Sequence, residues 1–376
     1  MKKPLFIILL CVLVVFIYLS LQHEQKPLFT MTNDVIVSES SIPFFSSEFI
    51  PQPIDLMISH SSTITRLANG DLLALWFAGS KEGQPDVKIW QSRFSNGKWE
   101  MAHEVLSNYG LMSATNRYIS KLGNPVVYRA ADGKLHLFVV SVSIGGWGGS
   151  RLNQLTSVDD GKSWSRANEL VLSPFLNIST LNRSNAIPLQ DGGFYLPVYH
   201  EFMRTYPFLL RFDATGKFIE QIRISNQNTM LQPSIVAVNE STAYVYMRNN
   251  NRKDNILYRQ VTTDGGLNWS AAHATNMTNP DSSLVVAKIS PNNLLMVYNI
   301  GAPTGNRGKL ALATSNDGIN WQQITLLENS VGNEFSYPSI IINGDQIDIT
   351  YTWSMKKLGH VIKHVRFNLA WLKTVK

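Results

Sequence analysis

One short motif recurs along this 376-residue chain and constrains its fold more than any other feature. Residues 157–164 (SVDDGKSW), 262–269 (TTDGGLNW) and 314–321 (TSNDGINW) follow one template of Ser or Thr, any residue, Asp or Asn, any residue, Gly, two residues and Trp. Weaker copies stand at 92–99 (SRFSNGKW) and 211–218 (RFDATGKF). The five copies begin at residues 92, 157, 211, 262 and 314, so their spacings are 65, 54, 51 and 52 residues. Such regular spacing indicates one structural unit repeated along the chain.

The motif has the chemistry of a hairpin turn. Asp or Asn accepts hydrogen bonds from the N–H groups of a turn, and Gly adopts the positive φ that a tight turn requires. The returning Trp is expected to pack beneath the hairpin. These motifs are therefore predicted to have a structural role and no part in chemistry.

Runs of five to eight β-branched and aromatic residues flank each copy of the motif, and turns such as 69–70, 132–133 and 191–192 separate them. No long helical periodicity occurs after residue 30. Three or four strands per unit of about 52–56 residues is typical of a β-propeller, and roughly 340 residues predict six blades in an all-β fold. Residues 182–189 are one of the predicted inner strands. A strand near residues 34–38 is expected to close the ring against the C-terminal segment 360–372, which is predicted to be extended.

The N-terminus is predicted to be a membrane anchor. Lys2 and Lys3 precede an uncharged apolar run at residues 4–21, which is long enough to cross a bilayer as a helix. The sequence shows no small-residue cleavage site after the run, which favours an uncleaved signal-anchor; a cleaved signal peptide is the alternative. We predict an anchor and linker at 1–29 and a propeller at 30–376, tethered to the inner membrane and facing the periplasm or the exterior.

Composition excludes several classes of protein. Cys11, inside the apolar run, is the single cysteine, so a disulfide framework and a thiolate metal site are excluded. Phosphate-binding, dinucleotide-binding and serine-nucleophile motifs are absent, and no cofactor or metal is expected. The net charge of +6 is spread over the chain, which suits an anionic small substrate or surface and not nucleic acid.

Motifs of this kind on six blades resemble the sialidase superfamily from about residue 50 to 370, and most closely the bacterial predicted neuraminidases with BNR (Asp-box) repeats. The resemblance implies three arginines that hold a sugar carboxylate, a tyrosine nucleophile activated by a glutamate, and an aspartate acid–base. Arg307 before KLALATSNDGINW and Arg248 in YVYMRNNN match two of the arginines. Tyr337 in SYPSIII matches the nucleophile.

Three positions depart from that pattern. His60 stands where the first arginine is expected, and Gln232 stands where the activating glutamate is expected. A glutamine cannot act as a base or carry the negative charge that activates a tyrosine. The loop at 78–86 (AGSKEGQPD) offers Glu82 and Asp86 in place of the usual acid–base motif. The predicted catalytic residues are therefore Tyr337, His60, Glu82 and Asp86.

Polar residues open the innermost strand of each predicted blade, where a propeller forms its central funnel. They are His60, Asn124, Asn182 or Arg183, Gln232, Asp281 and Tyr337. Arg248 and Arg307 have no acidic run nearby in sequence, so an anionic ligand is expected to be their partner. The predicted substrate-binding residues are Arg248, Arg307, Gln232, Asp281, Asn124, Lys121, His200, Glu201 and, for sugar stacking, Trp147.

The sequence is compatible with three functions. The first is an exo-sialidase-like glycoside hydrolase acting on acidic glycans. The second is a lyase-like enzyme on uronates, in which His60 and Tyr337 act as base and acid beside a carboxylate neutralised by arginines. The third is a membrane-tethered, non-catalytic glycan-binding propeller, which suits the missing glutamate.

Overall fold

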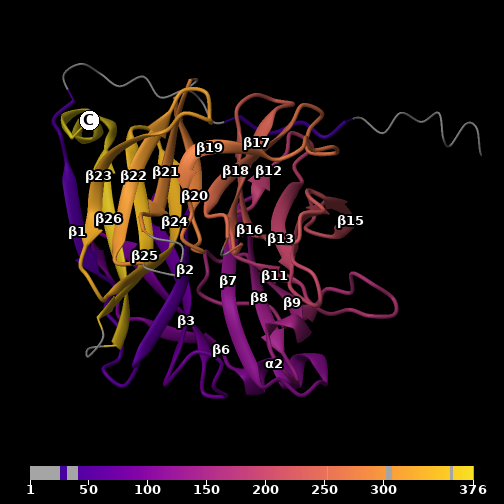
Figure 1. Cartoon of the computed structure of the whole chain (residues 1–376). Coiled ribbons are helices and arrows are strands. Elements are labelled where there is room, and N and C mark those ends of the chain that lie inside the picture. Colours follow the sequence, from indigo (N-terminus) through magenta and orange to yellow (C-terminus); the bar gives the residue numbers. More distant parts are fainter. Residues whose placement is uncertain are drawn as a thin grey trace, which may run out of the picture.

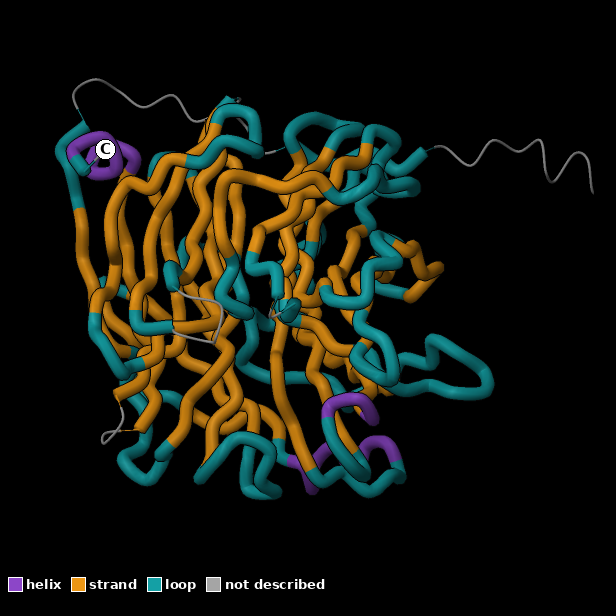
Figure 2. Tube along the Cα trace, viewed as in Figure 1, coloured by secondary structure: helices purple, strands orange, loops and turns teal. Residues whose placement is uncertain are grey.

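The computed structural model describes residues 26–31, 41–251, 253–290, 292–301, 307–355 and 359–375. Strands dominate these residues, and the helices are short (Figures 1 and 2). The helices are α2 (Asn108–Thr115), α3 (Leu369–Thr374) and the 3-10 turn η1 (Trp147–Gly149).

Four separate antiparallel sheets of four or five strands each follow one another along the described chain. They contain β7 (Lys121–Arg129), β8 (Leu135–Val142), β9 (Ser150–Ser157) and β10 (Asn168–Glu169); β11 (Leu181–Asn182), β12 (Ile187–Pro188), β13 (Phe194–His200), β14 (Tyr206–Phe212) and β15 (Phe218–Arg223); β16 (Met230–Ala237), β17 (Ala243–Asn249), β18 (Ile256–Thr262) and β19 (His273–Thr278); and β20 (Val285–Ser290), β21 (Asn293–Asn299), β22 (Lys309–Ser315) and β23 (Gln322–Asn329).

A further sheet of nine strands joins the two ends of the described chain. It contains β1 (Phe45–Phe49), β2 (Ile58–Arg66), β3 (Leu72–Gly79), β4 (Lys88–Ser95), β5 (Lys98–Trp99), β6 (His103–Leu106), β24 (Glu334–Asn343), β25 (Gln346–Met355) and β26 (Gly359–Asn368). Two antiparallel groups make up this sheet, and a single parallel pair, Ile58 with His360, connects β2 to β26.

The hydrophobic core lies between neighbouring sheets. Leu73 and Leu75 of β3 pack with Leu135 and Leu137 of β8, and similar clusters fill the spaces between the other sheets. β8 (LHLFVVSV) is buried on both faces because sheets cover it on both sides, so its sequence lacks the alternation of a half-exposed strand. Packing of this kind around the chain makes the fold all-β and propeller-like.

The repeated motifs form hairpin turns, as predicted. In the copy at 157–164, Ser157 Oγ accepts from Gly161 N at 2.9 Å and Asp159 Oδ1 accepts from Ser163 N at 3.0 Å. In the copy at 314–321, the residues that accept these two hydrogen bonds are Ser315 and Asp317, not residues 314 and 316 as the template predicts. This turn is one residue shorter, so the alignment by template was wrong there by one position.

An N-terminal strand pairs with the last strand of the chain. β1 pairs with β26 and lies beside it in Figure 1, with Phe45 opposite Phe367. The rings of Phe45 and Phe49 pack on Trp371 and Trp353, with centroid distances of 4.6 and 5.0 Å. The strand predicted near residues 34–38 lies outside the described residues.

The C-terminal segment is not extended to its end, contrary to the prediction. Residues 369–374 form α3, because the Asn368 side chain caps the helix by accepting from Trp371 N at 2.9 Å.

The predicted membrane segment also lies outside the described residues. Within the part of the chain that the structure describes, none of the helices is long and apolar enough to span a membrane. Residues 26–31 pack against the propeller: Phe29 is 1% exposed, Phe29 N donates to Glu240 O at 2.7 Å, and Thr30 N donates to Pro188 O at 3.0 Å. The predicted boundary at 29/30 therefore cuts through a packed segment.

Four innermost strands share a bulge near their start. The pairing register of β2, β7, β16 and β24 shifts at the same place in each strand. One residue of each bulge has positive φ: Ser61 (58°), Asn124 (36°), Gln232 (51°) and Tyr337 (54°). Such a conformation costs a non-glycine residue about 1–3 kcal/mol and is held only where the surrounding structure imposes it. His60 was predicted at this matching place, but Ser61 occupies it and His60 precedes it.

The innermost strand predicted at 182–189 is broken. Only its ends pair with β13, as β11 and β12, while residues 183–186 leave the ladder. Contacts across the centre of the ring, described below, hold them there.

Candidate functional site

Tyr337 lies at the centre of a cluster of aromatic and cationic side chains. Its ring meets His60 edge-on, with centroids 4.6 Å apart and an interplanar angle of 76°. The guanidinium carbons of Arg183 and Arg307 lie 5.3 and 5.5 Å from the centroid of the tyrosine ring. Residues from three widely separated parts of the chain therefore surround one phenol that stands on a strained bulge.

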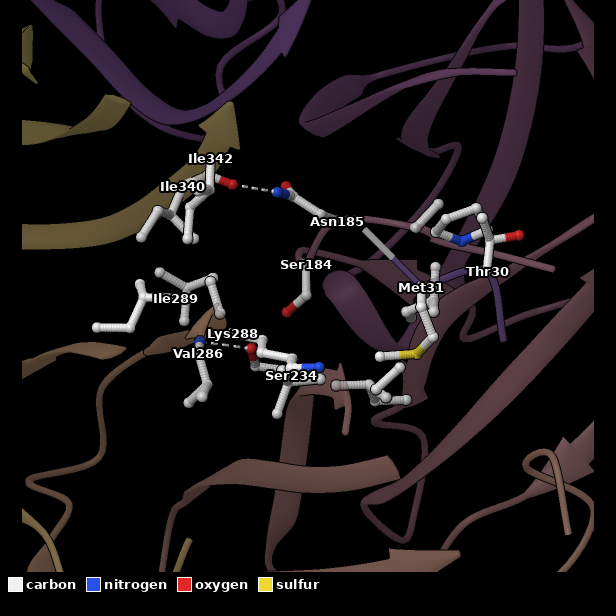
Figure 3. Close-up of a pocket in the computed structure, with 18 of the residues that line it drawn as sticks. Thr30, Met31, Ser184, Asn185, Ser234, Val286, Lys288, Ile289, Ile340 and Ile342 are labelled. Carbon is white, nitrogen blue, oxygen red and sulfur yellow. Dashed lines mark hydrogen bonds between the residues drawn. The ribbon is translucent and has the colours of Figure 1, made fainter. Parts of the chain in front are cut away.

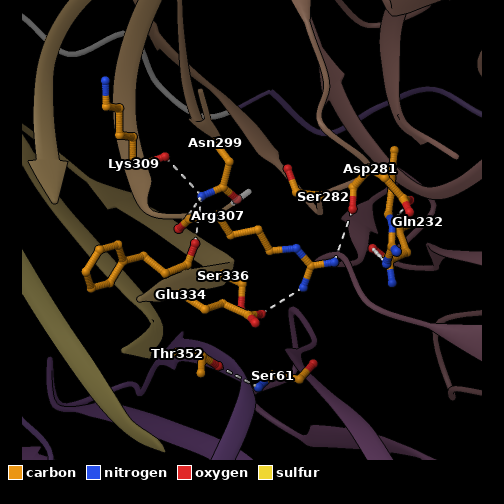
Figure 4. A network of polar contacts seen from close by, with 12 residues as sticks. Ser61, Gln232, Asp281, Ser282, Asn299, Arg307, Lys309, Glu334, Ser336 and Thr352 are labelled. Atoms are coloured by element: carbon orange, nitrogen blue, oxygen red, sulfur yellow. Dashed lines mark hydrogen bonds and ion pairs between the residues drawn. The ribbon is translucent and has the colours of Figure 1, made fainter. Parts of the chain in front are cut away.

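Both predicted arginines have acidic partners, so the expectation that they lack them was wrong. Arg307 Nη1 donates to Glu334 at 2.8 Å and its Nη2 donates to the Asp281 carbonyl at 3.1 Å (Figure 4). Arg248 Nε donates to the Asp281 carboxylate at 2.7 Å. The partners lie 27 and 33 residues further along the chain, so no local acidic run revealed them.

Arg248 keeps donors for a ligand. Its Nη1 makes one long contact, 3.5 Å, to Gln232 Oε1, and its Nη2 makes no hydrogen bond within the described residues. Gln232 Nε2 in turn donates to the Tyr199 hydroxyl at 3.3 Å. The amide at this position links a buried tyrosine to an arginine, and it provides no negative charge beside Tyr337.

His60 is a buried neutral base. His60 is only 6% exposed, and its Nδ1 has no hydrogen-bond partner within the described residues. Burial lowers the pKa of His60, and Arg307, Arg183 and His360 lower it further, although Glu334 acts in the opposite direction. The imidazole is therefore uncharged at neutral pH and keeps a lone pair available.

The lowered pKa of His60 predicts acid sensitivity. The unfolded chain takes up a proton near pH 6.5 while the folded imidazole stays neutral, so this stability is present above about pH 6.5 and is lost as the pH falls. We expect His60→Gln to reduce the loss of unfolding free energy between pH 7 and pH 5 by about 1–2 kcal/mol. Urea unfolding at the two pH values measures this, with exposed His273→Gln as the control. An unchanged pH dependence in His60→Gln would contradict the assignment.

Glu82 extends the cluster from the loop after β3. Although its side chain is exposed, desolvation by the surrounding protein raises the pKa of Glu82, and Glu334 raises it too, while Arg307, Arg248 and Lys121 lower it. Lys121 lies beside this loop and donates from Nζ to Gly145 O at 3.1 Å. A carboxyl group with a raised pKa is suited to donate a proton.

Glu201 approaches the cluster from the end of β13. Burial raises the pKa of Glu201, Arg248 lowers it and Asp281 raises it again. The carboxyl group of Glu201 therefore lies in the electrostatic field of the Arg248–Asp281 ion pair.

The other predicted residues have different surroundings. Asp86 caps its own loop by accepting from Ser80 N at 2.8 Å and Ser80 Oγ at 2.9 Å. His200 stacks on Tyr206 with centroids 4.6 Å apart. Trp147 lies over Gly123 so closely that a Cβ there would meet its indole at 2.7 Å. Asn124 occupies the bulge of β7.

Three residues of the cluster were not predicted: Glu334, His360 and Tyr199. Glu334 stands three residues before Tyr337, where Ser336 Oγ also donates to it at 2.7 Å. Burial acts to raise the pKa of Glu334, but the charge of Arg307 and the hydrogen bond from Ser336 outweigh burial and lower it. The ring of His360 lies 5.6 Å from that of His60, a contact that only closure of the ring creates. A glutamate three residues before the matched tyrosine was the one available sequence signal.

A separate cavity of about 270 Å³ lies among the inner strands (Figure 3). It is lined by Asn185, Val286, Ile340 and Ile342 among others. Ile340 and Ile342 belong to the second half of β24, whereas Tyr337 belongs to its first half, so this cavity does not include the cluster. No group of three or more metal-ligating side chains occurs in the described ranges.

Comparison with known proteins identifies the family. The BNR repeat-like domain model matches residues 70–349, and the chain therefore belongs to this family. No curated protein sequence is significantly similar to the chain.

Solved structures share the fold. A Hadza microbial sialidase has a TM-score of 0.70 at 17% identity, over 86% of this chain and 67% of its own. The NanB sialidase from Streptococcus pneumoniae has a TM-score of 0.68 at 10% identity, over 92% of this chain and 71% of its own. A protein of unknown function from Dyadobacter fermentans has a TM-score of 0.69 at 13% identity, over 87% of this chain and 100% of its own. The TM-scores show a shared sialidase-like fold, and at these identities the likeness extends to the fold alone.

Proposed function

We propose that this protein is a sialidase-like glycoside hydrolase that acts on acidic glycans. The observation that carries the proposal is the convergence of Tyr337, Arg248, Arg307 and His60 at one site. Family membership and the sialidase-like fold support a glycosidase, and Arg248 keeps donors for a sugar carboxylate.

Each residue has a role in a retaining mechanism. The Tyr337 oxygen attacks the anomeric carbon while the glycosidic C–O bond breaks, and Glu82 donates a proton to the leaving oxygen. Neutral His60 accepts the phenol proton, which Gln232 cannot do. Water then attacks the glycosyl–tyrosine intermediate, with Glu82 now accepting its proton, and Tyr337 is released as a phenolate that takes its proton back from His60.

We further propose a six-bladed propeller that is exported and tethered to a membrane. The two antiparallel groups of the nine-stranded sheet would be two blades, which with the other four sheets make six. The apolar run at 4–21 would anchor the chain, with its propeller in the periplasm or outside the cell.

Lyase-like cleavage of uronates is the second candidate. Neutral His60, with an unpartnered ring nitrogen beside Tyr337, favours it, because proton abstraction next to a carboxylate needs a base and an acid but no nucleophile. Non-catalytic glycan binding is the third candidate, and Gln232 in place of a glutamate favours it.

A screen against sialosides, uronate oligomers and neutral glycans separates these functions. Release of free sugar acid with a new reducing end supports the hydrolase. A new ultraviolet-absorbing double bond supports the lyase, and binding without turnover supports the third function. If only neutral glycans bind, the role of the arginines is wrong.

Arg248→Ala provides the matching test of substrate charge. We expect it to weaken binding of an acidic sugar about 10- to 150-fold, since a charge-assisted contact contributes on the order of 1.5–3 kcal/mol. Binding of a neutral sugar should not change. Arg211→Ala is the control, because Arg211 is similarly buried and pairs with Asp191 and Glu220 in another part of the ring. Calorimetric titration that shows equal losses for acidic and neutral sugars would count against a carboxylate partner.

A further inference from the structure

A short segment of the chain crosses the centre of the ring. Residues 183–186 separate β11 from β12 and make hydrogen bonds with strands of the nine-stranded sheet. Arg183 Nη1 donates to Ser62 O at 3.3 Å and Arg183 Nη2 donates to Pro338 O at 3.0 Å. Two residues on, Asn185 Nδ2 donates to Ile340 O at 2.7 Å, a bond visible in Figure 3.

The two carbonyl groups to which Arg183 donates lie directly after the bulge residues of β2 and β24. Ser62 follows Ser61, and Pro338 follows Tyr337, the two bulge residues with positive φ in β2 and β24. A strained backbone conformation persists only when its surroundings over-determine it. One planar guanidinium bonded to both bulges fixes their geometry together, and with it the position of the Tyr337 side chain relative to His60.

The charge of Arg183 is also unusual. Its residue is 2% exposed, its Nε has no partner, and it forms no ion pair with a carboxylate within the described residues. Burial lowers the pKa of Arg183 to about 10, so it remains charged at neutral pH. A buried, unpaired charge is costly unless a nearby group of opposite sign compensates it.

Tyr337 is the group best placed to supply that compensation once its phenol has given up its proton. Its ring centroid lies 5.3 Å from the Arg183 guanidinium carbon. Five other charged or titratable groups surround Tyr337, four from other parts of the chain and one from its own strand. They are His60 of β2, Tyr199 of β13, Arg248 of β17, Arg307 before β22, and Glu334 of β24. The cations among these act in the same sense as Arg183, whereas Glu334 opposes them and is already paired with Arg307.

We propose that Arg183 is a positioning residue that holds Tyr337 on its bulge and favours negative charge on the phenol oxygen. This proposal rests on the proposed function, in which Tyr337 is the reacting residue. Arg183 touches no reacting atom and acts through the tyrosine, whose ring it contacts.

Reactivity of Tyr337 tests this without any glycan. N-acetylimidazole acetylates phenol oxygens, and peptide mass spectrometry gives the rate at each tyrosine of the full chain. We expect Arg183→Met to slow acetylation of Tyr337 about 10-fold relative to Tyr109, which is 75% exposed and serves as the internal control. Arg183→Lys, which restores the charge, should give an intermediate rate.

Other outcomes overturn the proposal. An unchanged ratio of Tyr337 to Tyr109 in folded Arg183→Met contradicts it, and so does a lysine variant as slow as the methionine variant. If Arg183→Met fails to fold, Arg183→Gln takes its place with the same expected ratio and the same contradicting result.

Turnover gives a second, independent readout. Where the glycan screen finds a substrate, Arg183→Met should lower kcat about 100-fold and leave KM within about threefold, because the contact affects charge development and not ground-state binding. A fall in melting temperature with unchanged kcat would instead indicate a purely structural role. If the screen finds no turnover, the proposed function fails, while the acetylation ratio still decides the role of Arg183.

Discussion

Tyr337→Phe is expected to lower glycan turnover at least about 10³-fold while leaving the fold intact. The substitution removes only the phenol oxygen, which has no hydrogen bond to the protein within the described residues, so packing against His60 and Arg183 remains. Loss of a nucleophile or of a general acid reduces rates by about 10²–10⁴-fold, and both the hydrolase and the lyase need this oxygen. Steady-state rates on the substrate found by the glycan screen measure the effect.

Tyr109→Phe is the matched control for that experiment. Tyr109 belongs to α2 and is 75% exposed, so its loss should leave both rate and stability unchanged. A Tyr337→Phe variant that retains more than a tenth of wild-type turnover, with an unchanged melting temperature, would exclude a direct chemical role for the phenol.

Phe29→Ala is expected to lower the free energy of unfolding by about 3–5 kcal/mol, the cost of emptying a buried aromatic site. The Phe29 ring is buried among Leu189, Tyr195 and their neighbours, and it meets the Tyr195 ring edge-on at a centroid distance of 6.3 Å. Denaturant titration of the full chain gives the difference directly.

Phe175→Ala provides the comparison, because Phe175 is 96% exposed and its removal should change stability by less than about 0.5 kcal/mol. A loss below about 1 kcal/mol in Phe29→Ala would show that residues 26–31 contribute little to the fold. A chain shortened to begin at residue 30 should lose the same stabilisation, so expression of the propeller is best begun at Lys26.

The architecture was largely readable from the sequence because its signals are local. Each hairpin motif depends on contacts within eight residues, such as Ser157 with Gly161, so its sequence predicts the turn wherever the motif occurs. The apolar runs between the motifs predict strands for the same reason. Tyr337, Arg248 and Arg307 could be matched in place because each stands at a fixed distance from one of these local signals.

The bulges show where local reading stops. Proline follows the positive-φ residue in three of the four strands, at Pro125, Pro233 and Pro338, and this repetition is present in the sequence itself. It would have placed Tyr337, Gln232 and Asn124 in one structural position. It would not have placed Ser61, because Ser62 follows it in β2.

By itself, the sequence determined the repeated strands, the hairpins and the identity of the central tyrosine, since these depend on residues close together along the chain. The tertiary structure alone decided the partners: Asp281 for Arg248, Glu334 for Arg307, and Arg183 for the ring of Tyr337. Arg183 and Pro338 are 155 residues apart, and their contact exists only because the last strands return to pair with the first. Ring closure brings such residues together through packing summed over every sheet, and no short stretch of sequence encodes that sum.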